Sequence, residues 1–145
     1  MQRRTLLRRL GMGTAVAFAG CSGNPDADQL VNYYSEGYQT YQAGDEKGGS
    51  ATEYEGEKER QMRRNARDLM AEAKNKFEKA QGLAEKDQAV SYCKSAKMEA
   101  KYKQSVYNHL ASGKKNKALS ASRAALDHEV VAVSRVREAA SSGLL

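Results

Sequence analysis

The sequence predicts an all-α protein in which antiparallel helices follow a separate N-terminal segment. Three observations lead to this fold class. Apolar residues recur at spacings of three and four along most of the chain, which is the period of an amphipathic helix. The 145 residues include no Trp and only two Phe, which are residues that sheet proteins favour. The single Pro also argues against a fold of many strands joined by turns. The mean hydropathy of −0.78 also fits helices with long polar faces.

The charge is unevenly distributed. The whole chain has 24 Lys+Arg, 18 Asp+Glu and a formal charge of +6. Four of the basic residues are arginines within residues 1 to 20, which contain no acid. The remaining 125 residues are therefore nearly neutral, and they are enough for one domain of ordinary size.

The N-terminus has the three parts of an export signal. Arg3 and Arg4 begin a basic segment, residues 11 to 20 form a short apolar run, and small residues precede Cys21. The apolar run has about half of the ~20 residues that a membrane-spanning helix needs, so we do not expect a transmembrane anchor.

These residues resemble the twin-arginine signal peptide of prokaryotic lipoproteins. Arg3 and Arg4 match the arginine pair, and the Ala-Gly-Cys of residues 19 to 21 matches the lipobox. The resemblance implies cleavage after residue 20, lipid on Cys21, a tether over residues 21 to 26, and a helical domain over residues 27 to 142. It also implies a protein held at the outer face of the cytoplasmic membrane.

The first helix is expected over residues 26 to 43. Asp26 and Asp28 fall in its first turn, where carboxylates meet the positive end of the helix dipole. Its apolar stripe is formed by Leu30, Val31, Tyr34, Tyr38 and Tyr41. Residues 44 to 50 contain three glycines and no large apolar residue, so we expect a loop there.

Three further helices complete the predicted bundle. The second begins at Ser50 or Thr52 and extends to residue 84, and the third covers residues 88 to 112 behind an Asp87 N-cap. After a short turn, the fourth helix forms an antiparallel hairpin with the third and continues to about residue 137. Its expected inner positions are Ala118, Leu119, Ser122, Ala125, Leu126, Val130, Val133 and Val136. Residues 143 to 145 are expected to form a tail, and the chain is expected to fray from residue 141 onward.

Part of this pattern resembles the tetratricopeptide repeat. Gly113 followed by Ala118 and Ala125 is similar to the turn and second helix of that repeat, and Ala73, Phe77 and Ala80 have a similar spacing. The resemblance implies tetratricopeptide-like helical hairpins. A plain four-helix antiparallel bundle stays open as the alternative, since close-packed helices use small residues at the same spacings.

We find no residues arranged for catalysis or metal binding. On a continuous fourth helix, His109 and His128 would differ in height by roughly 16 Å, too far to share a metal. Glu99 and Glu129 are the one candidate carboxylate pair, and nothing in the sequence brings them together. With Cys21 acylated, Cys93 has no partner and is expected to be a small buried apolar residue. We therefore expect no enzyme, no cofactor and no metal.

A basic patch is the main functional lead. Lys94, Lys97 and Lys101 lie on one face of the third helix, and Lys114, Lys115 and Lys117 surround the following turn. These lysines can attract an acidic partner, or they can simply form a solvated helix face. The export signal argues against nucleic acid, so the expected partners are an envelope protein or an acidic surface polymer.

The sequence accordingly predicts a lipid-anchored binding protein of the cell envelope. Two alternatives stay open. One is a solute-binding lipoprotein with a pocket between helices lined by Tyr34, Tyr38 and Tyr41. The other is a structural spacer without a partner.

Overall fold

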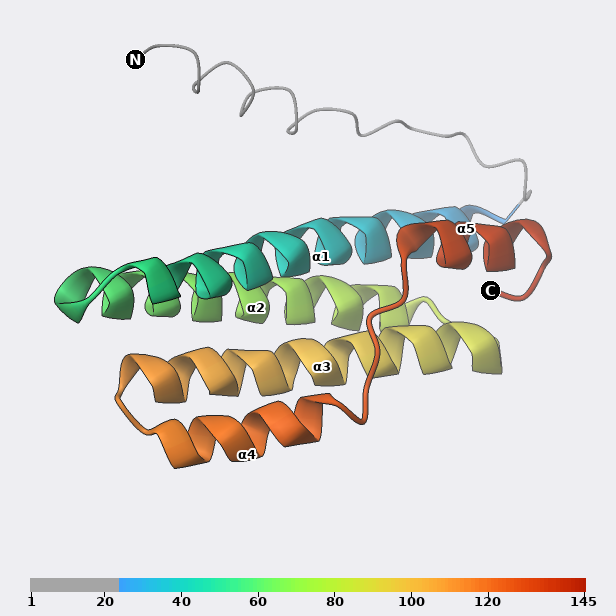
Figure 1. The fold of residues 1–145 in the computed structure, drawn as a ribbon. Helices are drawn as coiled ribbons and strands as arrows, with labels where there is room; N and C mark the ends of the chain where they lie inside the picture. The colour runs from blue at the N-terminus through green and yellow to red at the C-terminus, as the bar shows by residue number, and fades with distance from the viewer. Residues whose placement is uncertain (1–23) are drawn as a thin grey trace, which may run out of the picture.

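A computed structural model describes residues 24 to 145. Within that part, five α-helices and one 3-10 turn are present, without a strand, which confirms the all-α prediction (Figure 1). The helices are α1 (Pro25–Ser50), α2 (Gly56–Gly82), α3 (Asp87–Ala111), α4 (Lys115–Ala125) and α5 (Val133–Ser141), and the turn is η1 (Ala51–Glu53). The predicted signal peptide, with Arg3, Arg4 and the lipidation site Cys21, lies outside the described residues.

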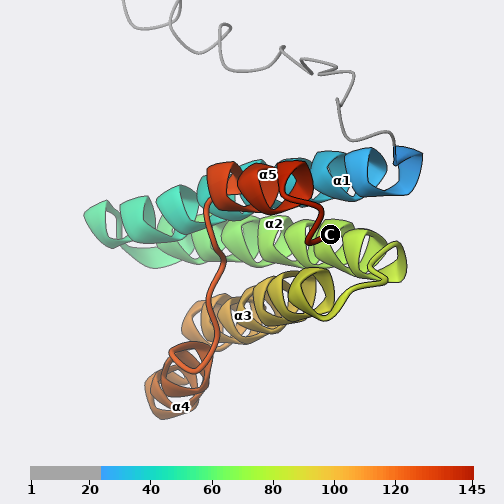
Figure 2. The same ribbon diagram turned by 90° about the vertical axis from the view of Figure 1, so that its right-hand side faces the viewer.

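Helices α1 to α4 run antiparallel to their neighbours along the chain (Figure 1). Helix α2 packs on both α1 and α3, and α4 packs on α3 at the edge of the molecule (Figure 2). The predicted hairpin of the third and fourth helices is confirmed. Helix α5 returns to lie beside α1, and residues 126 to 132, here called the link, carry the chain across α3 to reach it.

Helix α1 is longer than predicted. Asn24 caps its N-terminus, since its side-chain oxygen accepts a hydrogen bond from Asp26 N at 3.1 Å. The helix then continues through the glycine-rich segment to Ser50, so the loop predicted for residues 44 to 50 is wrong. Gly44 and Gly48 lack a side chain, which lets residues of α2 and α3 pack directly against α1, and both glycines are buried as a result. A Cβ on Gly48 would lie 2.1 Å from the Tyr107 ring.

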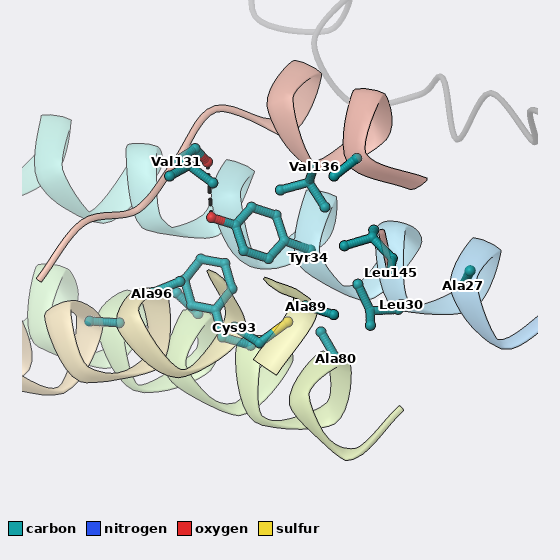
Figure 3. Close-up of a cluster of buried hydrophobic side chains, with 14 residues drawn as sticks. Ala27, Leu30, Tyr34, Ala80, Ala89, Cys93, Ala96, Val131, Val136 and Leu145 are labelled. Atoms are coloured by element: carbon teal, nitrogen blue, oxygen red, sulfur yellow. Dashed lines mark hydrogen bonds between the residues drawn. The ribbon is translucent and has the colours of Figure 1, made fainter. Parts of the chain in front are cut away.

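Small residues dominate the core between the helices. Alanines at 66, 73, 80, 89, 96 and 100 are completely buried. The largest fully buried side chains are Tyr34, Phe77, Leu30, Met70, Val136 and Cys93, several of which are drawn in Figure 3. Tyr34 and Phe77 meet with ring centroids 5.1 Å apart. Alanine and glycine thus allow close helix packing, and a few large side chains fill the remaining space.

The predicted fourth helix is divided in two by the link, so its expected continuation to residue 137 is wrong. Three hydrogen bonds hold the link in an irregular conformation. Glu129 N donates to Ser95 Oγ and Val130 N donates to Glu99 Oε2, each at 2.8 Å. The Tyr34 hydroxyl donates to Val131 O at 2.9 Å (Figure 3). These side chains of α1 and α3 satisfy backbone groups of the link that a helix would otherwise pair internally.

The C-terminal tail is also ordered differently from the prediction. Leu145 is 6% exposed and belongs to the main core cluster, together with Leu30 and Val136. Gly143 has φ of 70°, a conformation that glycine adopts readily, and Lys86 Nζ donates to its carbonyl oxygen. The fraying expected for residues 143 to 145 is therefore wrong, because the last leucine is buried in the core.

Cys93 is fully buried, as predicted, and burial raises the pKa of its thiol to about 12. In a Cys21→Ser variant at pH 8, we expect iodoacetamide to alkylate folded Cys93 about a thousandfold more slowly than the unfolded chain, since alkylation needs an exposed thiolate. Mass spectrometry over time measures the difference, and the same variant in guanidinium is the control. Equal rates with and without denaturant would show that the α1–α3 core opens freely.

Candidate functional site

The second half of α3, the following turn and α4 form a block with positive charges only. Residues 100 to 126 contain no Asp or Glu, and Glu99 and Asp127 stand directly before and after them. The basic residues in this block are Lys101, Lys103, Lys114, Lys115, Lys117 and Arg123. A continuous stretch of one sign concentrates anionic groups at its surface.

The structure separates the six predicted lysines into different settings. Lys94 and Lys101 are exposed on α3, and Lys114, Lys115 and Lys117 are exposed at the turn and the start of α4. Lys97 is half-buried, with its Nζ 4.0 Å from Glu78 Oε1 on α2. The α3–α4 turn therefore gathers three of the six predicted lysines, and the other three lie along α3.

Helix α4 leaves two leucines in solvent. Leu119 is 52% exposed and Leu126 is 82% exposed, although the sequence pattern predicts both on the inner side. Ala118 and Ala125 are buried in their place. Since residues four and seven apart share a helix side, one surface, here called the leucine face, contains Lys115, Leu119, Ser122 and Leu126.

A groove lies on the other side of α4, where it meets α3. Its volume is about 500 Å³, and it is largely open to solvent. Six of its lining residues are polar and none is acidic: Tyr102, Ser105, His109, Asn116, Lys117 and Ser120. The Tyr102 ring stacks on the ring of His128 from the link, with ring centroids 5.6 Å apart and an interplanar angle of 17°. Sequence reasoning missed this groove because its residues come from two helices at no diagnostic spacing.

The carboxylates of Glu99 and Glu129 have different surroundings. Half-buried Glu99 accepts hydrogen bonds from the Tyr41 hydroxyl and from Val130 N, so it joins α1, α3 and the link. Burial and the Glu99 carboxylate raise the pKa of the Tyr41 hydroxyl. The Glu129 carboxylate is exposed, 4.0 Å from Arg135. Glu99 therefore stabilises the fold by joining three segments, whereas the Glu129 carboxylate is directed to solvent near Arg135.

Two of the three tyrosines of the predicted solute pocket use their hydroxyl groups in hydrogen bonds within the protein. Tyr34 is completely buried against Phe77, and its hydroxyl is bonded to the link. The Tyr41 hydroxyl is bonded to Glu99, and Tyr38 is half-buried on the same helix. The groove described above is lined by none of these three residues.

Two kinds of feature, a metal-binding cluster and a membrane-spanning helix, are absent from residues 24 to 145. Those residues contain no cluster of three or more His, Cys, Asp or Glu side chains that could hold a metal ion. None of the helices described combines the length and apolarity that crossing a membrane demands. The chain matches no protein-family model, no curated protein and no solved structure.

Proposed function

We propose that the protein is a lipid-anchored, extracytoplasmic binding protein that holds an acidic partner protein of the cell envelope on the leucine face of α4. It acts without an enzyme activity and without a cofactor. The observation that carries this proposal is the exposure of Leu119 and Leu126 inside a block of basic residues.

The leucine face has the composition of a small protein interface. Such interfaces combine an apolar centre, where a few side chains provide most of the binding energy, with a polar rim. Burying one exposed leucine contributes about 1.5–3 kcal/mol. Lys115 shares the leucine face, Lys114 is next to it in the chain, and no carboxylate occurs in residues 100 to 126. This charge favours a partner with acidic residues around its own apolar contact.

The proposed location depends on the sequence of the first 21 residues. Lipid on Cys21 would hold the domain at the outer membrane surface, a few residues along the chain from the start of α1 at Pro25. Confinement to that surface raises the effective concentration of a partner in the same membrane layer.

A photocrosslinking experiment tests the partner. A benzoylphenylalanine is placed at Leu126 in the full chain, in cells that process the signal, and at exposed Asn75 on α2 as a control. We expect one adduct, specific to position 126, with a protein that has an acidic surface segment, and we expect it to weaken at high salt. Identical adducts from both positions, or none, contradict the proposal and favour the spacer.

The substitution Leu126→Glu is expected to abolish that partner interaction without unfolding the protein. The new carboxylate repels the acidic partner, so binding is lost. Because the Leu126 side chain is 82% exposed, the substitution should change the free energy of unfolding by no more than about 0.5 kcal/mol. Leu144→Glu is the matched control, because Leu144 is also exposed but does not belong to the leucine face. Pull-down with the identified partner and thermal unfolding are the measurements. Loss of binding in both variants contradicts an interface at α4.

A further inference from the structure

We propose that the groove between α3 and α4 binds internal units of an acidic polysaccharide, a polymer of hydroxyl-rich sugars bearing carboxylates. The juxtaposition that supports this is Lys117 and the side chains of Ser105, Ser120 and Asn116 around one open groove beside Tyr102. The inference extends beyond the proposed protein interface, because it assigns a second ligand to a different surface.

The lining residues match the functional groups of a sugar acid. Lys117 supplies a positive charge for a carboxylate, and no acidic residue in the lining would oppose the anion. Asn116 and Ser105 can both donate and accept hydrogen bonds, which suits hydroxyl groups that do the same. His109 adds a further polar side chain from α3 to the lining. A simple inorganic anion would leave most of these groups unused.

The shape of the groove favours a polymer over a small solute. A volume of about 500 Å³ is within the range of small-molecule sites, but those sites normally enclose their ligand. A groove that is open to solvent leaves room for a ligand that extends beyond it. Tyr102 gives one wall an apolar ring with a polar tip, and the stack with His128 fixes the orientation of that ring. A sugar ring can pack on such a wall while its hydroxyls reach the polar side chains.

The groove and the leucine face are separate surfaces of one helix. The groove is lined on the α4 side by residues that include Lys117, Ala121 and Ala124. Each of these stands two positions from a residue of the leucine face, and two positions correspond to roughly 180° of rotation around the helix axis. A substitution in the groove should therefore leave the protein interface intact. The two proposals can fail independently.

Binding to defined oligomers tests the inference. Full chain carrying Cys21→Ser is titrated with tetragalacturonate while amide NMR shifts are recorded, and the other ligands are maltotetraose, tetraglutamate and inorganic phosphate. We expect tetragalacturonate alone to shift the signals of Ser105, Asn116 and Ser120 together. Lys117→Gln should weaken this binding about tenfold, the usual effect of losing one charge-assisted contact. Lys94→Gln, a change in an exposed lysine of α3 that does not line the groove, should leave it unchanged.

Several results would overturn the inference. Equal weakening by Lys94→Gln would mean a diffuse attraction to positive charge. If tetraglutamate or phosphate binds as tightly as tetragalacturonate, the sugar hydroxyls do not contribute to recognition. If maltotetraose binds as tightly, the carboxylate does not contribute. Absence of shifts at the groove with tetragalacturonate would reject the site. Thermal unfolding of each variant establishes that these exposed substitutions leave the fold intact.

Discussion

Gly48→Ala is expected to destabilise the protein by roughly 2–4 kcal/mol, although alanine is the better helix former. The added Cβ would lie 2.1 Å from Cε1 and 2.3 Å from Cζ of Tyr107, so the ring must move. Tyr107 is 8% exposed, and its hydroxyl donates to Asp45 Oδ1 at 2.9 Å. Lys103 Nζ lies 2.6 Å from the same carboxylate oxygen. Moving the ring therefore disturbs both packing and a polar contact between α1 and α3.

Gly49→Ala provides the matched control on the same helix. A Cβ at Gly49 would meet nothing within 4 Å, and the residue is exposed inside α1. Alanine there is expected to stabilise the protein by about 0.5–1 kcal/mol, because it restricts the unfolded chain. Denaturant unfolding of both variants measures the two changes. If the neighbouring glycines respond alike, α1 does not contact α3 at Gly48 as described.

The glycines also show where sequence reasoning succeeded and where it failed. Spacings of three and four predicted the all-α fold and its first three helices, although α2 begins at Gly56 and not at Ser50 or Thr52. Gly113 correctly marked the α3–α4 turn, where its φ is 71°. The same residue type marked a false loop at residues 44 to 50. A glycine can end a helix, or it can lie inside a helix where the absence of a side chain leaves room for a tyrosine of another helix. Composition alone does not distinguish these two roles. That distinction depends on the partner, Tyr107, which is 59 positions away from Gly48.

The candidate site was predictable only in part. The sequence pointed to lysines near the α3–α4 turn, and the structure places Lys114, Lys115 and Lys117 there. It did not predict the leucine face, because the apolar pattern placed Leu119 and Leu126 on the inner side together with Ala118 and Ala125, and only the two alanines are buried. The chain leaves the helix at Ala125, and Glu99 and Ser95 bind the backbone of the link. These long-range hydrogen bonds have no local sequence signal.

Phe77→Ala is expected to cost about 3–5 kcal/mol, because it removes a fully buried ring from the centre of the core. Phe77 contacts Tyr34, whose hydroxyl holds the link at Val131, so the effect should extend to α5. Denaturant unfolding measures the loss, and hydrogen exchange of the α5 amides reports its spread. Asn75→Ala, two positions away and exposed, should change stability by less than about 0.5 kcal/mol.

The same ring explains why α1 has a glycine at position 37. A Cβ on Gly37 would lie 2.8 Å from Cε1 of Phe77, so Gly37→Ala alone is expected to cost roughly 1–3 kcal/mol. In the Phe77→Ala background the clash with the ring is gone and only the closer contact with Lys76 Cβ, at 3.2 Å, remains, so the same change should cost much less. A double-mutant cycle should therefore give a coupling of at least about 1 kcal/mol, whereas simple additivity would mean that the two residues do not meet. Glycine on α1 and phenylalanine on α2 thus form one packing unit, in which the shape of each requires the other.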